Sequence, residues 1–237
     1  MSGPASALSG SVVFFTGAGI SVGAGLPTYR GTGGLYESSS LTPPSAEDVT
    51  RERLPALWDR FRPRLRAFDD LAPSRAHRSI AGFEGSGSAR VTVVTQNVDG
   101  LHPRAGSTRV HELHGSLRTM RCLAHGHRHA VPAVPWSAGE APACPTCGDV
   151  CRPNIVLFGE TLPAQAFSDA TAAMREADTV VAVGTSALVY PAAFLIGPEY
   201  TAGSRLVWIN PETAPPNSTW TWRQGTADDE VERLLSP

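Results

Sequence analysis

Residues 11–21 read Ser-Val-Val-Phe-Phe-Thr-Gly-Ala-Gly-Ile-Ser, a β-branched and aromatic run that ends in two closely spaced glycines. An apolar run of this length is typical of a buried parallel strand. A glycine turn after such a strand brings backbone N–H groups close to the phosphates of a nucleotide, at the start of the next helix. We therefore expect a nucleotide site at Gly17, Ala18, Gly19 and Ser21, with a plain tight turn as the alternative.

The turn departs from the fingerprint of hydride-transferring dehydrogenases. Val22 stands where G-x-G-x-x-G has its third glycine. Those enzymes also need an acidic residue at the end of a second strand, roughly 20 positions on. Glu37 has the distance, but it lies in a Gly- and Ser-rich stretch with the composition of a loop. The pattern argues against a dehydrogenase of this kind.

Three further β-rich runs, residues 90–95, 179–183 and 205–209, each end in polar residues. Helical patterns cover residues 163–177 and 227–235. Alternating strands and helices predict an α/β fold with a doubly wound parallel sheet, similar to a Rossmann domain. Because ligands bind beyond the carboxyl ends of such strands, we expect the residues that follow them to converge on one rim. These residues are Gln96, Gly184 and Asn210, which should meet Gly17 there.

Two segments interrupt the alternation. Residues 41–73 are rich in proline and arginine with a helical centre, and residues 121–151 are rich in proline, glycine, histidine and cysteine. We expect a helical and a zinc-binding insertion that together form a small domain. The main nucleotide-binding domain would then comprise residues 8–40, 74–120 and 152–237.

The composition is that of an ordinary globular protein. Of the 237 residues, 41% are hydrophobic and 18% charged, and the net charge of −2 argues against a broadly basic nucleic-acid surface. The N-terminus lacks signal-peptide features, and no run of about 18 apolar residues occurs. We expect a cytoplasmic monomer with no membrane or specific nucleic-acid partner. All 20 cationic residues are arginine, so the chain cannot be regulated by acylation of its own lysine side chains.

The four cysteines all lie between positions 122 and 151, which indicates a metal site rather than a disulfide framework. Cys144 and Cys147 form a C-x-x-C pair, and Cys122 and His125 form a C-x-x-H pair upstream. Two tight pairs of sulfur and imidazole ligands suit one structural zinc ion. The alternatives for the fourth ligand are His127, His129 and Cys151. A loop with merely buried cysteines is the non-metal alternative.

Several motifs occur together in one order along the chain. Residues 95–102 read Thr-Gln-Asn-Val-Asp-Gly-Leu-His, residues 111–116 His-Glu-Leu-His-Gly-Ser, residues 184–186 Gly-Thr-Ser and residues 209–212 Ile-Asn-Pro-Glu. With Leu-Pro-Thr-Tyr-Arg-Gly at 26–31 and Phe-Gly-Glu at 158–160, the chain resembles the sirtuin family of NAD-dependent protein deacylases, bacterial type, over about residues 11–235.

The resemblance implies a reaction that consumes NAD. The acyl group of a lysine in a protein or peptide is transferred to ADP-ribose, and nicotinamide is released. It assigns His114 as the general base, whose ordinary pKa near 6.5 leaves neutral imidazole abundant at neutral pH. Asn97 and Asp99 resemble the pair that lines the nicotinamide pocket, and Gln96 would hold ribose hydroxyls. An ordinary Asx turn is the alternative for this pair.

Further residues are assigned by the same resemblance. Thr28, Tyr29 and Arg30 would belong to a loop that closes over the nucleotide, and Tyr29 stands where the family most often has phenylalanine. The phosphates, the riboses and the adenine edge would be contacted by Gly184, Thr185, Ser186, Asn210, Glu212, Gly225 and Ala227. The substrate peptide would lie along Val156, Phe158, Gly159 and Glu160, and would pair with the main chain of a strand there.

The chain also partly resembles the branch of the sirtuin family that removes succinyl and malonyl groups, which bears on the acyl group it would prefer. That branch carries Tyr-x-x-Arg at the offset where this chain has Phe61 and Arg64, 16 residues before His77. A guanidinium matches a carboxylate, whereas the missing phenol removes one hydrogen bond. Pro63 inside the motif threatens its helix. The alternative is that Arg64 is one exposed arginine among several.

Two other functions compete with deacylation. A mono-ADP-ribosyltransferase would use the same cleavage of NAD with a different acceptor. A non-catalytic sensor of NAD or ADP-ribose would use its zinc module to contact a partner, but intact Asn97, Asp99 and His114 count against this.

Overall fold

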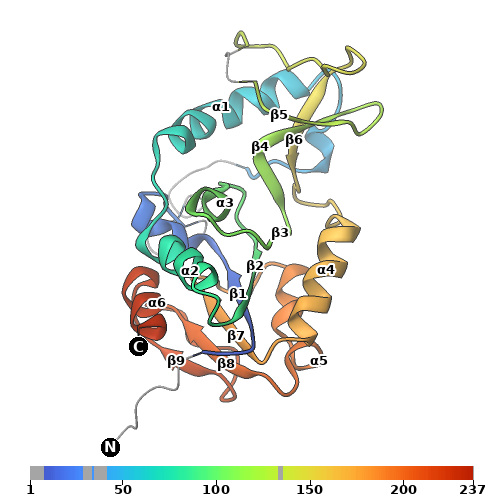
Figure 1. The fold of residues 1–237 in the computed structure, drawn as a ribbon. Helices are drawn as coiled ribbons and strands as arrows, with labels where there is room; N and C mark the ends of the chain where they lie inside the picture. Colours follow the sequence, from blue (N-terminus) through green and yellow to red (C-terminus); the bar gives the residue numbers. More distant parts are fainter. Residues whose placement is uncertain (1–7, 29–33, 35–41, 133–135, 237) are drawn as a thin grey trace, which may run out of the picture.

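The computed structural model describes residues 8–28, 34, 42–132 and 136–236. Its main element is a six-stranded parallel sheet in the order β3-β2-β1-β7-β8-β9 (Figure 1). The strands are β1 (Ser11–Thr16), β2 (Arg90–Thr95), β3 (Val110–Glu112), β7 (Thr179–Val183), β8 (Arg205–Ile209) and β9 (Thr221–Arg223). The predicted doubly wound α/β sheet is confirmed.

The central strands owe their apolar sequences to burial on both faces. No residue of β1 or β7 is exposed. In register, Thr16 pairs with Thr95 and Val183, and Val183 pairs with Ile209. The carboxyl ends of four strands therefore lie level, and the segments that follow them begin at one rim.

Helices cover both faces of this sheet, and Figure 1 shows α2 and α6 on one side and α4 and α5 on the other. Phe14 of β1 belongs to the core cluster that contains Ile80 and Val231, whereas Phe15 belongs to the cluster that contains Met174 and Leu195. The first side carries η1 (Ala18–Ala24), α2 (Arg75–Gly85), α3 (Leu101–Ala105) and α6 (Ala227–Leu235). The second carries α4 (Ala164–Arg175), η3 (Ala192–Ile196) and α5 (Pro198–Thr201).

A second, three-stranded antiparallel sheet has the order β5-β4-β6 and lies beyond the rim with α1 (Figure 1). Its strands are β4 (Gly115–Cys122), β5 (Arg128–Ala130) and β6 (Cys151–Ile155), α1 spans Leu54–Asp70, and the short η2 spans Ala46–Asp48. Trp58 of α1 packs against Met120 and donates its indole N–H to the Cys151 carbonyl at 2.7 Å. Helix α1 continues through Pro63. The small sheet extends beyond residues 121–151 on both sides, so the domain limits stay a prediction.

No helix among the described residues is both long and apolar enough to cross a lipid bilayer.

Candidate functional site

A cavity of about 910 Å³ lies at the rim of the main sheet. The predicted convergence is present: the Gln96 amide donates to Thr185 Oγ1 at 3.0 Å, and the Asn210 amide donates to the Thr185 carbonyl at 3.0 Å. The predicted cofactor and catalytic residues in its lining are Gly17, Ala18, Gly19, Thr28, Gln96, Asn97, His114, Gly184, Thr185, Ser186, Asn210, Glu212 and Ala227. The predicted substrate residues in its lining are Phe61, Arg64, Val156, Phe158, Gly159 and Glu160.

A second cavity of about 310 Å³ adjoins the first, since Ala18, Pro27, Arg64, Asn97 and Val98 line both. It adds Ser21 and Asp99 to the lining. Gly225 lies in neither lining. Tyr29 and Arg30 lie outside the described residues.

The glycine turn is shaped by its neighbour strand. The N–H groups of Gly17 and Gly19 donate to the carbonyls of Val183 and Gly184 at 3.0 and 2.9 Å. A Cβ on Gly19 would lie 2.6 Å from Gly184 Cα. Glycine is therefore required because two turns meet here, and these two amides are already used within the protein. The segment then continues as a 3₁₀ helix, which the sequence pattern did not indicate.

The protonation state of His114 follows from its contacts. Its Nδ1 lies 2.8 Å from the Gln96 carbonyl, which can only accept, so Nδ1 carries the hydrogen. The lone pair of Nε2 is therefore available, and His114 lines the larger cavity. Burial lowers the pKa of His114 below its usual value, against the opposing effect of the Gln96 carbonyl. A neutral imidazole with an available Nε2 is the form that a general base requires.

The turn after His114 fixes this geometry. Gly115 has φ +74°, and a Cβ there would lie 2.1 Å from the Asn154 carbonyl oxygen. The Val156 N–H donates to the His114 carbonyl at 2.9 Å. Strands β4 and β6 thus hold the imidazole at the boundary between the two sheets.

Asn97 and Asp99 meet at Ser21. The Ser21 hydroxyl donates to Asp99 Oδ2 at 2.8 Å, and the Asn97 amide donates to Ser21 Oγ at 3.2 Å and to the Gly17 carbonyl at 3.1 Å. Asp99 Oδ1 accepts the Leu101 N–H at 2.9 Å, which is an Asx turn. The pair lines the smaller cavity as well. The Asx turn and the pocket are therefore features of the same residues rather than alternatives.

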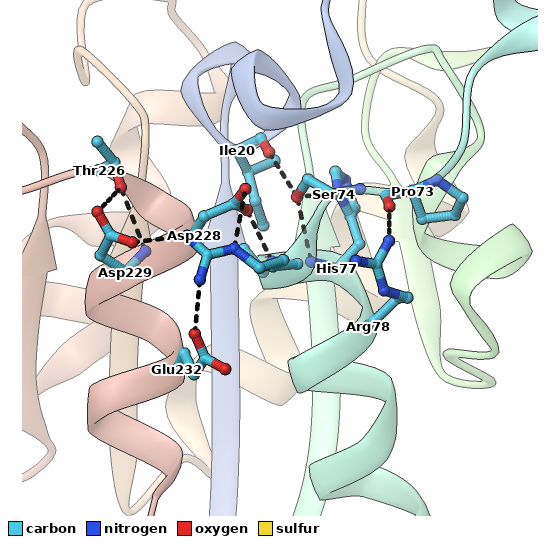
Figure 2. Close-up of polar contacts among 11 residues, drawn as sticks. Ile20, Pro73, Ser74, His77, Arg78, Thr226, Asp228, Asp229 and Glu232 are labelled. Carbon is cyan, nitrogen blue, oxygen red and sulfur yellow. Dashed lines mark hydrogen bonds and ion pairs between the residues drawn. The ribbon is translucent and has the colours of Figure 1, made fainter.

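Helices α2 and α6 meet at one end of the larger cavity, which Arg75 and Asp228 line. Figure 2 shows Asp228 of α6 at the start of α2. Asp228 Oδ1 accepts the Ala76 N–H at 2.8 Å, and the Arg75 guanidinium bonds Asp229 and Glu232 at 2.7 and 2.9 Å. Sequence reasoning missed this contact. The acidic first turn of α6 indicated a helix start but not the helix that it would face.

The Ser74 side chain links α2 to the glycine turn, also drawn in Figure 2. Its hydroxyl donates to the Ile20 carbonyl at 3.1 Å, and its backbone N–H donates to Nδ1 of His77 at 3.3 Å. The start of α2 is thereby fixed to η1, which carries part of the cavity wall.

Two tryptophans hold the loop of Asn210. Trp222 Nε1 donates to the Asn210 carbonyl at 3.1 Å, and Trp208 Nε1 donates to the Thr213 carbonyl at 2.7 Å. Asn210 Oδ1 accepts the N–H groups of Glu212 and Thr213 at 3.0 and 2.8 Å. The Asn210 side chain thus shapes the loop, and nothing in the sequence pattern identified the tryptophans as its support.

Phe61 and Arg64 lie together on α1 and both face the larger cavity. The Arg64 guanidinium carbon is 5.7 Å from the centre of the Phe61 ring. Arg64 also lines the smaller cavity, beside Asn97 and Asp99. Its charge is therefore placed between the two cavities.

The segment of Phe158 is a bridge followed by a turn, whereas we expected a strand that offers its main chain to a peptide. The Phe158 N–H donates to the Pro44 carbonyl at 3.3 Å, and its carbonyl accepts the Ala46 N–H at 2.8 Å. Gly159 has φ +85°, and the Glu160 N–H donates to the Leu157 carbonyl at 3.0 Å. Pairing with residues 44–46, far away in sequence, explains the difference.

The predicted metal ligands gather near the end of β4. Ligand atoms of Cys122, His125, His127 and Cys147 lie within 4.8 Å of one another, and the two sulfurs are 3.5 Å apart. Four such atoms are positioned to bind a metal ion and suit a tetrahedral structural zinc. His127 occupies the place in this quartet that we expected for Cys144.

Cys144 lies directly beside the quartet. Its sulfur is 3.6 Å from His127 Nδ1 and 3.5 Å from His129 Nε2. Cys151 is fully buried, and the quartet of neighbouring ligand atoms contains neither Cys151 nor Cys144. Because the Cys144 sulfur contacts His127, we consider these two residues as the candidates that accompany Cys122, His125 and Cys147.

The fold and the rim define an α/β protein with a large cavity, a histidine in its lining that burial favours in the neutral form, and a separate Cys/His cluster. Residues 17–191 match the model of the Sir2 family. The chain is 41% identical over 233 residues to NAD-dependent protein deacylase 2 of Pyrobaculum aerophilum, covering 94% of this chain and 89% of that protein. The chain belongs to the Sir2 family, as the motifs indicated.

Solved structures of Sir2 proteins have the same fold as this chain. A Sir2 homolog in complex with NAD superposes with a TM-score of 0.80 at 33% identity, covering 95% of this chain and 88% of the other. A Sir2 complex with a p53 peptide and NAD+ superposes with a TM-score of 0.79 at 31% identity, covering 95% and 92%.

Proposed function

We propose that this protein is an NAD-dependent protein-lysine deacylase that transfers the acyl group to ADP-ribose with release of nicotinamide. The observation that carries the proposal is His114, whose neutral form burial favours and whose Nε2 is free, in the lining of the large cavity. Its volume, about 910 Å³, lies near the upper end of the usual range for ligand sites, about 300–1,000 Å³.

The residues present fit NAD. The polar groups that follow β1, β2, β7 and β8 converge on the cavity, as a dinucleotide requires. NAD would supply an anomeric carbon whose bond to nicotinamide is broken in the reaction. Asn97 and Asp99 would orient the nicotinamide carboxamide in the smaller cavity, and Gln96 and Asn210 would lie along the riboses. His114 Nε2 would accept a ribose hydroxyl proton, while Nδ1 stays bonded to Gln96.

We further propose a preference for acidic acyl groups, carried by Arg64. A guanidinium that lines the cavity above an apolar ring suits an acyl chain that ends in a carboxylate. Helix α1 is continuous through Pro63, so the side chains of Phe61 and Arg64 project from one helix toward the cavity. Because Phe61 lacks the phenol, the preference should be weaker than in relatives with both groups.

Mass spectrometry of the protein incubated with NAD and an acylated peptide tests the activity. Loss of the acyl mass from the peptide together with acyl-ADP-ribose is expected. ADP-ribose found on a protein, with the peptide unchanged, would instead identify an ADP-ribosyltransferase. Bound NAD without any turnover would identify a sensor.

The acyl preference is tested by comparing succinyl-lysine and acetyl-lysine peptides at fixed salt. A charge-assisted hydrogen bond contributes about 1.5–3 kcal/mol, so Arg64→Met should lower kcat/KM for the succinyl peptide roughly 10- to 100-fold. The acetyl peptide should change little, and Phe61→Tyr should shift the preference the other way. Equal losses on both peptides would mean that Arg64 supports the fold or the cofactor.

A further inference from the structure

Three arginines lie side by side across the small sheet. In the antiparallel register, Arg121 of β4 is paired with Arg128 of β5 on one side and with Arg152 of β6 on the other. Directly opposed residues of antiparallel strands project from the same face, and like charges in such pairs destabilise a sheet. The three residues, called the arginine row below, therefore need a compensating anion.

Only one of the three charges is compensated within the described part of the chain. Arg152 is 3% exposed and bonds both oxygens of Glu160, one of them at 2.8 Å. The side chains of Arg121 and Arg128, unlike their backbones in the sheet, form no hydrogen bond or ion pair with any described residue. Two guanidiniums thus remain without a carboxylate of their own.

The arginine row faces away from the small domain's core. Met120 and Cys122, the neighbours of Arg121 along β4, are buried against Trp58. Side chains alternate along a strand, so Arg121 projects from the opposite face. Arg128 is exposed at the end of the row.

The row begins at the edge of the large cavity. Glu160, which Arg152 holds, lines that cavity together with Phe158 and Gly159. A protein segment that leaves the cavity past Glu160 would therefore meet Arg121 and then Arg128.

We propose that Arg121 and Arg128 form a docking surface for acidic side chains that flank the acyl-lysine of the substrate protein. This inference rests on the deacylase function but not on the acyl preference of Arg64. Aspartate and glutamate carboxylates match the fork of a guanidinium and would relieve the repulsion within the row. A basic flanking sequence would be repelled.

The test uses acetyl-lysine peptides only, so that the outcome is independent of Arg64. Three peptides of equal length carry two glutamates before the acetyl-lysine, two glutamates after it, or glutamines throughout. At low ionic strength we expect one acidic peptide to exceed the neutral peptide about three- to tenfold in kcat/KM, mostly through KM, as two exposed ion pairs allow. The preference should fade at high salt.

Variants of the arginine row then test whether these arginines cause the preference for acidic peptides. Arg121→Gln and Arg128→Gln should each reduce the preference and leave the neutral peptide unchanged, and Arg121→Glu should favour a lysine-flanked peptide instead. Arg128 is exposed, so its variant still tests the proposal if changes at Arg121 impair folding. Arg90→Gln is the matched control, because Arg90 is an exposed arginine at the start of β2, far from the rim where the cavity lies.

Peptide affinity by fluorescence anisotropy gives the same comparison without turnover, so a failure of docking is distinguishable from a failure of catalysis. Equal kcat/KM and equal affinity of wild type for acidic and neutral peptides would overturn the proposal. So would an Arg128→Gln variant that weakens all peptides alike, because that result would show a structural role.

Discussion

His114 is set for its role by one carbonyl and by burial. The Gln96 carbonyl fixes the hydrogen on Nδ1. Because burial lowers the pKa of His114 more than this hydrogen bond raises it, the imidazole should stay neutral at pH values where a free histidine is already protonated. The acid limb of the pH profile of kcat/KM should therefore lie below pH 6.5. A limb at or above pH 6.5 would contradict the assignment.

Removal of the same side chain should separate catalysis from binding. His114→Ala should lower turnover by about 10²–10⁴, the usual cost of losing a positioned base. NAD affinity, measured by calorimetry, should change little, because Gly17, Gln96 and Asn210 line the cavity independently of the imidazole. A variant that keeps more than half of the wild-type turnover would refute the role.

Glu112, two residues before His114, is a carboxyl group that should destabilise the folded protein as the pH rises. Burial, assisted by the charge of Asp99, raises its pKa to about 7 in the folded protein. The unfolded chain therefore binds fewer protons than the folded one between about pH 4.5 and 7, and this group lowers stability as pH rises through that window. Glu112→Gln should be more stable than wild type at pH 8 and close to it at pH 4.5. Urea unfolding at both pH values measures this, and an equal difference at both would contradict it.

At the scale of elements, the junction of α2 and α6 links stability to cofactor binding. The Asp228 carboxylate accepts an N–H from the first turn of α2 and also lines the cavity. Losing such a cap costs about 0.5–2 kcal/mol. We expect Asp228→Ala to lower the urea midpoint and to raise KM for NAD more than it lowers kcat. Glu232→Ala, which removes only an exposed ion pair with Arg75, is the control and should change neither.

The sequence pattern predicted the elements whose own residues are buried in the core, because burial there requires an apolar sequence. Strands β1, β2, β7 and β8 and helices α4 and α6 all form where their apolar periodicity indicated. Strand β9 has no such pattern, since Thr221 and Trp222 are exposed and the strand exists because it pairs with β8. The turn at Phe158 and the contact of Asp228 with α2 also depend on partners distant in sequence, which periodicity cannot identify.

At the scale of the whole molecule, the cavity draws residues from both the main sheet and the small one. Strand β4 begins at Gly115, directly after His114, and ends at Cys122 in the metal cluster. Helix α1, which carries Phe61 and Arg64, packs against this strand through Trp58 and Met120. The metal cluster is therefore connected to His114 by one strand, and to the part of the cavity that Phe61 and Arg64 line by one helix.

Removal of the metal should consequently abolish activity from a distance. We expect about one zinc per chain, and a strong chelator should unfold the small sheet, because metal binding supplies folding free energy there. Loss of turnover should accompany loss of zinc, with the main sheet still folded by circular dichroism. The variants His127→Ala and Cys144→Ser identify the fourth ligand, since only the variant of the true ligand should lose zinc. The control is Cys151→Ala, which removes a buried thiol and should retain zinc. Full activity in metal-free protein with an unchanged melting curve would show that the cysteines and histidines hold the small sheet without a metal.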